Sequence, residues 1–423
     1  MNRLANSSEF AWRGRSKARL GLAVPKARFT HVGALHAIAL VLAWLSAGLA
    51  PGAAHAQTQA ADFVPKARQV VLMDADSGAI LYQHNADQLA APASLSKLMT
   101  LAVAFKLLKS GKLNRGDEFV MSVNAWRRGG APSGTSAMMV PVNAKVRLDE
   151  LLQGIVVQSG NDASISVAEG IAGSEDAFAK VMTEEARRIG MPKSQFRNPT
   201  GLYHPDHLMT AKELAILARY IMREYPDYFP LFSQKEFVYR RHKFVNKNPL
   251  LFADPTVDGM KTGYVKQAGY GMVVTSRQNE RRLIAVVNGA ASDNERKDEV
   301  KRLLDWGYKN VSEFKIYEAT EVIGQARVWG GSAFYVPLVG NGDISIWLPR
   351  FPAGQRLKGE IVYASPLKAP IQKGTEVAKL RVTSSTSAMQ EVPLYAAESV
   401  DEGGLMRRGL DSLAHLAFRW VPR

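Results

Sequence analysis

The feature that most constrains the fold is a serine–lysine pair at the start of a long apolar segment. Ser94 and Lys97 follow Pro92-Ala93, and the apolar-periodic run 95–108 ends before Gly111. The periodicity and the closing glycine predict a buried helix with Ser94 in its first turn. Positions three apart lie on one face of a helix, so the Ser94 hydroxyl and the Lys97 amine can meet.

Two further Ser-x-x-Lys matches show that the spacing alone is weak evidence, because chance supplies about one or two in a chain of this length. Ser312/Lys315 and Ser365/Lys368 sit among turn and strand residues. On a strand, positions three apart point to opposite faces, so these pairs do not converge. The context therefore favours the pair at Ser94.

Two other short motifs follow in order along the chain. Ser159-Gly160-Asn161 comes after the apolar run 151–157, and Lys261-Thr262-Gly263 precedes a strand pattern at 271–274. Taken singly, the first is typical of a glycine turn with an asparagine cap, and the second of a solvated lysine near a turn. Their occurrence in this order, with the Ser94 motif, indicates one catalytic site.

The first motif supplies a nucleophile and its base. A serine hydroxyl is a poor nucleophile at neutral pH and needs an adjacent base. The chain has no Gly-x-Ser-x-Gly elbow, which argues against a hydrolase with a histidine base. Lys97 can act as the general base if it is neutral, and both burial and a second cation, for which we name Lys261, favour the neutral amine.

The remaining motif residues supply a relay and substrate contacts. We expect Ser159 to pass the proton toward the leaving amine, and Lys261 to stay charged and bind a substrate carboxylate together with Thr262. The backbone amides of Ser94 and Tyr264 are the candidates for an oxyanion hole. Asn161 is expected to hydrogen-bond the amide of the substrate, and Gly263 completes the third motif.

The chain resembles the low-molecular-mass penicillin-binding proteins, a family of serine-type D-alanyl-D-alanine carboxypeptidases, from about Ala67 to the C-terminus. Besides the three motifs, several segments carry the resemblance: Asp74-x-Asp76-x-Gly78, Pro92-Ala93-Ser94, Asn198-Pro199-Thr200-Gly201-Leu202, Val257-Asp258-Gly259, Ala268-Gly269-Tyr270 and Leu367-Lys368-Ala369-Pro370-Ile371. Tyr264 stands where some members have histidine. Since Tyr264 acts through its backbone in our interpretation, this departure removes no catalytic role.

The resemblance implies a penicillin-binding/β-lactamase-like catalytic domain and a Ser94 acyl-enzyme. It implies release of the terminal D-alanine from peptidoglycan stem peptides, covalent inhibition by β-lactams, and no cofactor or metal. A β-lactamase and a DD-endopeptidase of the same fold stay open as alternatives, as does a non-catalytic wall-binding scaffold. A lactamase needs a deacylating glutamate, and no Glu-x-x-x-Asn signature follows Asn161.

The N-terminal segment predicts export. Residues 1–56 carry a long basic region, an apolar stretch at 38–50 and a small-x-small site at Ala54-His55-Ala56, which together are typical of a signal peptide. A membrane-spanning anchor is the alternative, but the apolar stretch is shorter than the roughly 20 residues that crossing a bilayer takes. We expect the protein to work in the periplasm or outside the cytoplasmic membrane.

The composition of the chain limits the classes of molecule that it is expected to bind. Seven Lys/Arg and one Glu lie in residues 1–56, so their removal lowers the formal net charge from +15 to +9. Export and the lack of a basic-aromatic recognition motif argue against nucleic acid, whereas anionic lipid or wall polymer fits a basic surface. The chain has no cysteine, so disulfides and cysteine-bound metals are excluded. His204 and His207 lie three apart in a Pro/Asp-rich loop, which is weak evidence for zinc.

The order of the patterns predicts an α+β fold. Strand patterns at 69–73 and 79–83 flank the turn Asp76-Ser77-Gly78, the middle at 94–227 is mainly helical, and strands return from about Val257. This order predicts one antiparallel sheet built from both ends, with the third motif on a strand facing the Ser94 helix. The Gly/Ser-rich stretch 128–136 is expected to be a loop near the site.

The C-terminal part changes character. After a short linker at 57–66 and a catalytic domain at 67–312, short strands alternating with turns predict a small all-β domain at 313–400. A final segment, 401–423, has a stripe of apolar residues at Met406, Leu410, Leu413, Ala417 and Trp420. This spacing predicts a basic amphipathic helix that attaches peripherally to the membrane surface, the alternative being a helix packed on the β domain.

Overall fold

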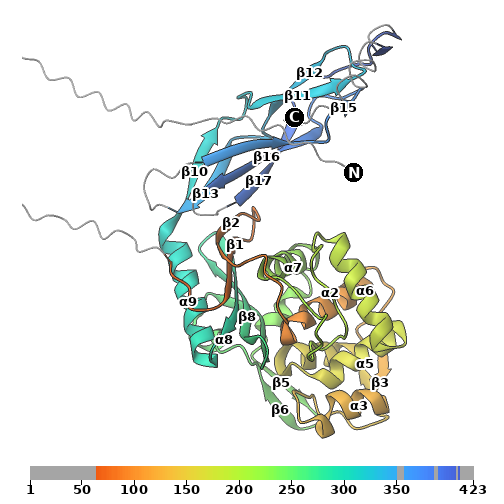
Figure 1. The fold of residues 1–423 in the computed structure, drawn as a ribbon. Coiled ribbons are helices and arrows are strands. Elements are labelled where there is room, and N and C mark those ends of the chain that lie inside the picture. Colours follow the sequence, from red (N-terminus) through yellow and green to blue (C-terminus); the bar gives the residue numbers. More distant parts are fainter. Residues whose placement is uncertain (1–62, 350–356, 385–388, 406–407, 410–423) are drawn as a thin grey trace, which may run out of the picture.

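The computed structural model describes residues 63–349, 357–384, 389–405 and 408–409 (Figure 1). The predicted signal peptide, and most of the predicted amphipathic helix, lie outside the described residues. The described part has a mixed helix–sheet region followed by an all-β region, as the sequence predicts. The domain boundaries named above stay predictions.

The central antiparallel sheet takes strands from both ends of the first region, which confirms the predicted hairpin and the predicted topology. Its order is β2-β1-β9-β8-β7. The strands are β1 (Gln69–Asp74), β2 (Ile80–His84), β7 (Val257–Val265), β8 (Gly269–Gln278) and β9 (Arg281–Ala290). The third motif lies on the edge strand β7.

Both faces of this sheet are covered. All six residues of β1 are buried, and successive side chains point into two different cores because a strand alternates its faces. Val71 and Met73 join the core of the helical part, whereas Val70 and Leu72 pack with the long helix that follows β9. Figure 1 shows that helix, α9, on the side of the sheet away from α2 and α7.

The middle of the chain is mainly helical, as predicted. The helices are α2 (Lys97–Lys109), α3 (Val123–Gly129), α4 (Leu148–Gln153), α5 (Asn161–Ala172), α6 (Glu175–Arg188), α7 (Ala211–Glu224), α8 (Leu250–Ala253) and α9 (Asp293–Asn310). Single turns stand at η1 (Ala93–Ser96), η2 (Ala131–Ser133), η3 (Gly154–Gln158) and η4 (Phe229–Ser233). Four helices begin at a serine or threonine whose side chain accepts a backbone N–H three residues on: Ser122, Ser174, Thr210 and Ser292.

The stretch expected to be a loop is only partly one. Helix α3 continues to Gly129 and η2 takes residues 131–133, so the prediction of a loop over 128–136 is wrong for its first half. The side-chain cap at Ser122 starts this helix, and the composition of the stretch did not reveal it. Residues 134–136 do lie beside the site.

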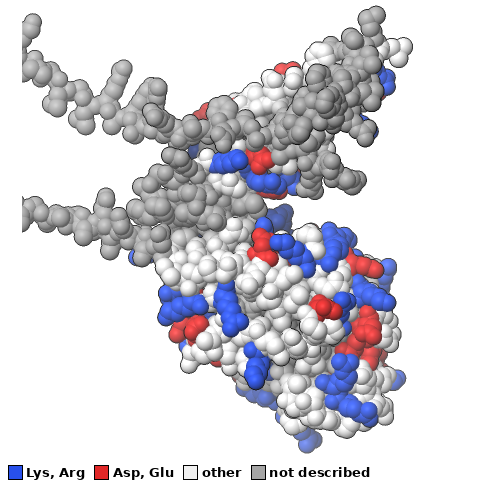
Figure 2. Space-filling view, in the orientation of Figure 1, with Lys and Arg blue, Asp and Glu red and all other residues white. Residues whose placement is uncertain are grey.

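Two small antiparallel strand pairs complete the first region: β3 (Glu118–Val120) with β4 (Lys145–Arg147), and the hairpin of β5 (Glu236–Tyr239) with β6 (His242–Val245). Figure 2 shows basic and acidic side chains interspersed over this face of the helical part. Among the described residues, none of the helices is both long and apolar enough to cross a bilayer.

The second region is all-β, as predicted. Its strands are β10 (Val311–Tyr317), β11 (Gly324–Trp329), β12 (Tyr335–Val339), β13 (Ile344–Pro349), β14 (Leu357–Val362), β15 (Leu367–Lys368), β16 (Glu376–Ser384) and β17 (Met389–Ala396). They enclose a separate apolar core that includes Val336, Leu338 and Leu394. One pair, Met389 of β17 with Ile80 of β2, continues the ladder into the central sheet.

Candidate active site

A single helical turn presents the first motif. Ser94 lies in η1, and the chain then enters α2, of which ten of the thirteen residues are buried. Lys97, the first residue of this central helix, is therefore fully buried. Its Nζ donates to the Ser94 Oγ at 3.0 Å, to the Asn161 Oδ1 at 2.7 Å and to the backbone carbonyl of Thr200 at 2.5 Å.

Close backbone packing holds this turn in place. Gly201 has a φ of +77°, and a Cβ on it would lie 1.8 Å from the carbonyl oxygen of Ala93. Gly263 approaches from the other side, where a Cβ would lie 3.1 Å from the carbonyl oxygen of Pro92. Glycine at these two positions lets the segment before α7 and the strand β7 reach the Ser94 turn.

The environment of Lys97 favours the neutral amine. Burial is the main cause that lowers the pKa of Lys97 to about 7, the charge of Lys247 acts in the same direction, and Asp162 opposes both. Lys247 thus acts as the second cation that the sequence analysis assigned to Lys261. Lys97 in turn is one of the charges that lower the pKa of Lys261.

The second motif follows an irregular turn. The helix α4 continues into the wider turn η3, after which Ser159 adopts a left-handed conformation with φ of 61°. The Ser159 Oγ is buried and has no hydrogen-bond partner among the described residues. A buried hydroxyl without a partner is costly, and such groups persist where a substrate or a reacting group supplies the missing bond.

Asn161 is fixed by the neighbouring loop. Its backbone N–H donates to the carbonyl of Ser136 at 2.7 Å, and its Nδ2 donates to the Thr135 Oγ1 at 2.8 Å. The Oδ1 consequently faces Lys97. Each end of the amide makes one bond to the protein, and a second Nδ2 hydrogen is left over, so the expected hydrogen bond of Asn161 to the substrate amide stays a prediction.

Asp162, the next residue, is buried and bound by backbone amides. Its carboxylate accepts from the N–H groups of Met138 at 2.7 Å, Ala163 at 2.9 Å and Val140 at 3.3 Å. Burial raises the pKa of Asp162, whereas these hydrogen bonds lower it. This carboxylate anchors the strap 138–140 against α5, and no motif of the sequence analysis included it.

The strand that carries the third motif, β7, forms the opposite wall, which Tyr264 and Val265 line. Lys261 is buried, and its Nζ donates to the backbone carbonyl of Thr262 at 3.1 Å. Burial lowers the pKa of Lys261 well below its usual value, and the charges of Lys97, Lys247 and Arg296 add to this effect. The expectation that Lys261 stays charged therefore depends on a bound anion, because a carboxylate beside it favours the charged form.

One residue of this wall lies at the rim. Tyr264 is 53% exposed, and its ring packs on that of Tyr270 with centroids 4.3 Å apart. Arg296, on α9 behind the strand, donates to the carbonyl oxygens of Gly263 at 3.4 Å and Gly271 at 3.3 Å and pairs with Asp293. Sequence analysis missed Arg296, which reads as an ordinary helix residue.

These walls enclose a cavity of about 460 Å³. Its lining residues are Ser94, Gly134, Thr135, Ser136, Gln158, Asn161, Thr200, Gly201, Leu202, Lys247, Tyr264 and Val265. The structure therefore brings the three motifs together, with Ser94, Asn161 and Tyr264 at the surface and Lys97, Ser159 and Lys261 behind it. Sequence analysis missed Lys247, which stands two residues after β6 and in no recognised motif.

A buried histidine lies close to this site. His207 is buried, its ring packs on that of Phe196, and burial is the main cause that lowers its pKa to about 3. The described part of the chain contains no cluster of three or more His, Cys, Asp or Glu side chains able to hold a metal ion.

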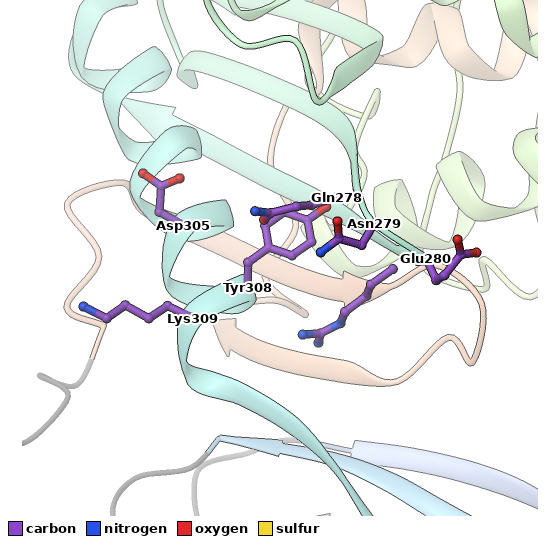
Figure 3. Close-up of a pocket in the computed structure, with 7 residues that line it drawn as sticks. Gln278, Asn279, Glu280, Asp305, Tyr308 and Lys309 are labelled. Carbon is purple, nitrogen blue, oxygen red and sulfur yellow. The ribbon is translucent and has the colours of Figure 1, made fainter.

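A second cavity, of about 550 Å³, lies between the β8–β9 turn and the end of α9 (Figure 3). Two of its polar lining residues have partners within the protein: the Tyr308 hydroxyl donates to the carbonyl of Ser276 at 2.7 Å, and Asp305 pairs with Lys301. Arg281 stacks over Trp347 of β13 at 4.1 Å. This cavity marks the joint between the two regions and contains no motif residue.

Comparison with known proteins agrees with the geometry. A family model described as D-alanyl-D-alanine carboxypeptidase matches residues 55–292, and one described as penicillin-binding protein 5, C-terminal domain, matches residues 312–402. The carboxypeptidase DacC of Escherichia coli is 33% identical over 84% of this chain and 89% of its own length.

Solved structures show the same fold. Penicillin-binding protein 5 of Haemophilus influenzae has 34% identity and a TM-score of 0.66, covering 81% of this chain and 99% of that one. Penicillin-binding protein D2 of Listeria monocytogenes, solved with bound cefotaxime, has 25% identity and a TM-score of 0.54, covering 59% of this chain and all of that one.

The fold and the three motifs together define a penicillin-recognising serine acyl-enzyme. Within that class, the chain belongs to the D-alanyl-D-alanine carboxypeptidase family. It is an enzyme, a serine-type D-Ala-D-Ala carboxypeptidase with the C-terminal domain of the penicillin-binding protein 5 type.

Proposed function

We propose that this protein removes the terminal D-alanine from peptidoglycan stem peptides through an acyl-enzyme on Ser94. The observation that carries the proposal is the contact of a fully buried lysine amine, Lys97 Nζ, with the Ser94 Oγ at 3.0 Å. A base whose pKa is about 7 is half neutral at physiological pH, which suits a general base.

The reaction begins with proton transfer. Neutral Lys97 takes the proton of Ser94, whose oxygen attacks the carbonyl carbon between the two terminal D-alanines. The backbone amides of Ser94 and Tyr264 are proposed to stabilise the oxyanion, because donors placed where charge develops lower the barrier.

The tetrahedral intermediate then collapses. The buried Ser159 hydroxyl, which has no other partner in the described part of the chain, is proposed to pass the proton to the leaving amine nitrogen. The carbon–nitrogen bond breaks, D-alanine leaves, and water hydrolyses the acyl ester on Ser94. Lys261 and Thr262, with Gly263 allowing the close approach of the strand, are proposed to bind the terminal carboxylate.

The cavity favours this activity over a β-lactamase. A lactamase needs efficient deacylation, usually by a glutamate poised over the acyl ester. No aspartate or glutamate lines the cavity within the described residues, and Asp162 is committed to three backbone amides. β-Lactams are therefore expected to acylate Ser94 and to leave it slowly.

The experiment that tests the proposal measures free D-alanine released from a soluble D-Ala-D-Ala pentapeptide by the mature protein, beside Ser94→Ala. We expect the wild type to release D-alanine. In Ser94→Ala the rate of release should fall by at least about 10³-fold, because the variant has no nucleophile at this position. Penicillin labelling of the same two proteins is the companion assay. Labelling retained at another serine would refute the assignment.

We also propose that the protein works outside the cytoplasmic membrane and attaches to its outer surface through residues 401–423. The support is the apolar stripe and the basic residues of that segment, which suit an interfacial helix. Deleting 404–423 should move the protein from the membrane fraction to the soluble fraction and leave the release of D-alanine unchanged. Unchanged membrane association would exclude this anchor.

A further inference from the structure

Lys247 is a basic residue in the cavity wall that belongs to none of the three motifs. It stands two residues after β6, and its Nζ donates to the Ser136 Oγ at 2.6 Å. The two residues are 111 positions apart in sequence. This contact ties the end of the β5–β6 hairpin to the loop 134–136 across the cavity.

The same loop holds Asn161. The Ser136 carbonyl accepts from the Asn161 N–H at 2.7 Å, and Thr135 accepts from the Asn161 Nδ2 at 2.8 Å. With its Nδ2 fixed in this way, the Asn161 amide presents Oδ1 to the Lys97 Nζ at 2.7 Å. A continuous chain of hydrogen bonds thus runs from Lys247 to the base of the reaction.

We propose that Lys247 is a positioning residue that holds the loop 134–136 and, through Asn161, keeps the Lys97 amine against Ser94. The inference rests on the proposed function, since it assigns Lys97 the part of the base. A misplacement of a reacting group by about 1 Å can cost 10²-fold in rate, so a clamp on a loop has a kinetic effect without touching the substrate.

Lys247 also contributes its charge. The charged and titratable groups around Lys97 come from four elements: Lys247 after β6, Asp162 on α5, Lys261 on β7 and His207 before α7. Lys247 disfavours the protonated form of Lys97, and Asp162 favours it. Removing the Lys247 charge should therefore shift the rise of activity to higher pH.

The test compares Lys247→Met, Ser136→Ala, the double variant and Lys247→Arg by rates of penicillin acylation across pH. Lys243→Met is the matched control, because Lys243 lies on the same hairpin, pairs with Glu236 and does not line the cavity. We expect Lys247→Met to lower the maximal acylation rate about tenfold and to raise the midpoint of its acid limb. Ser136→Ala should lower the rate without moving the midpoint.

Two comparisons separate positioning from other roles. The double variant should lose no more rate than Lys247→Met, and Lys247→Arg should recover most of the rate, because it keeps both charge and donor. The proposal would be overturned if the rate losses of Lys247→Met and Ser136→Ala added up in the double variant. It would also be overturned if Lys247→Met left the maximal acylation rate unchanged and altered only its dependence on penicillin concentration. A Lys243→Met variant that behaves like Lys247→Met would overturn it as well.

Amide hydrogen exchange gives a readout that does not depend on activity. In full-length protein, the Asn161 amide should exchange at least about tenfold faster in Lys247→Met than in the wild type, because its acceptor loop is released. An unchanged exchange rate of the Asn161 amide in Lys247→Met would refute the proposal that Lys247 holds the loop 134–136. If the wild type lacked penicillin labelling at Ser94, the proposed function would fail, whereas the exchange experiment would still decide the clamp.

Discussion

The two regions of the molecule differ in what they bury. The first region buries charged groups in its core, among them Lys97, Asp162, Lys261 and Arg296, whereas Gln390 is the one buried polar side chain recorded among the described residues of the C-terminal strands. Burying a charge costs free energy unless partners compensate it. Side chains with perturbed pKa values gather at functional sites. The buried charges of the first region therefore lower its stability at the place where the reaction is expected to occur.

Among substitutions at these buried charges, Lys97→Met is expected to lower the rate of penicillin acylation most. It replaces the buried amine with an apolar side chain of similar length. Loss of a general base typically costs 10²–10⁴-fold, and we expect penicillin acylation to fall by about 10³-fold or more. Stopped-flow acylation measures it. Retention of the wild-type rate would show that this buried charge is structural.

The lowered pKa of Lys97 predicts how the acylation rate and the stability of the protein change with pH. Acylation needs neutral Lys97, whose pKa is about 7, so the wild-type rate should rise with pH and reach half its plateau near pH 7. In the unfolded chain the amine has its usual pKa of 10.5, so between pH 7 and 10.5 the unfolded state binds more protons. The stability of the wild type relative to Lys97→Met should therefore increase with pH over that window and be lowest below it.

A smaller effect is expected from Lys261→Met. Hydrogen bonds to charged groups contribute about 1.5–3 kcal/mol, so kcat/KM for a peptide with a free terminal carboxylate should fall by roughly 10–100-fold. The amidated peptide serves as the control, because it lacks the charge that Lys261 is proposed to bind. Equal losses with both peptides would refute the anchoring role.

The comparison also shows what the sequence can and cannot predict. The hairpin around Asp76-Ser77-Gly78, the buried helix after Ser94 and the strand that carries Lys261 follow from periodicity and turn residues, which are local signals. The motifs were predicted to converge because they occur in the order of one catalytic site, and because the expected sheet topology places the third motif on a strand that faces the Ser94 helix.

The contact of Lys97 with Ser94 was predicted, but its contact with Thr200 and the charge of Lys247 beside it were missed for a physical reason. The Thr200 carbonyl is 103 positions away from Lys97, and the Lys247–Ser136 contact joins residues from different hairpins and loops. Such contacts depend on tertiary packing and leave no periodic signal, so the second cation was assigned to Lys261, the lysine that a motif made visible. The C-terminal region was predicted as an all-β domain, and the structure confirms that class.

The smallest effect on activity is expected in the apolar region. Leu394 is fully buried in the C-terminal core, and Leu394→Ala should lower the free energy of unfolding of that region by about 2–4 kcal/mol. Release of D-alanine from soluble peptide should stay within about twofold, because the described residues of this region contribute nothing to the cavity. Leu405→Ala, at an exposed position, is the matched control and should change neither quantity. A fall in acylation with Leu394→Ala alone would instead mean that strain passes through the Met389–Ile80 strand pair into the central sheet, and the two regions would then share one energetic unit.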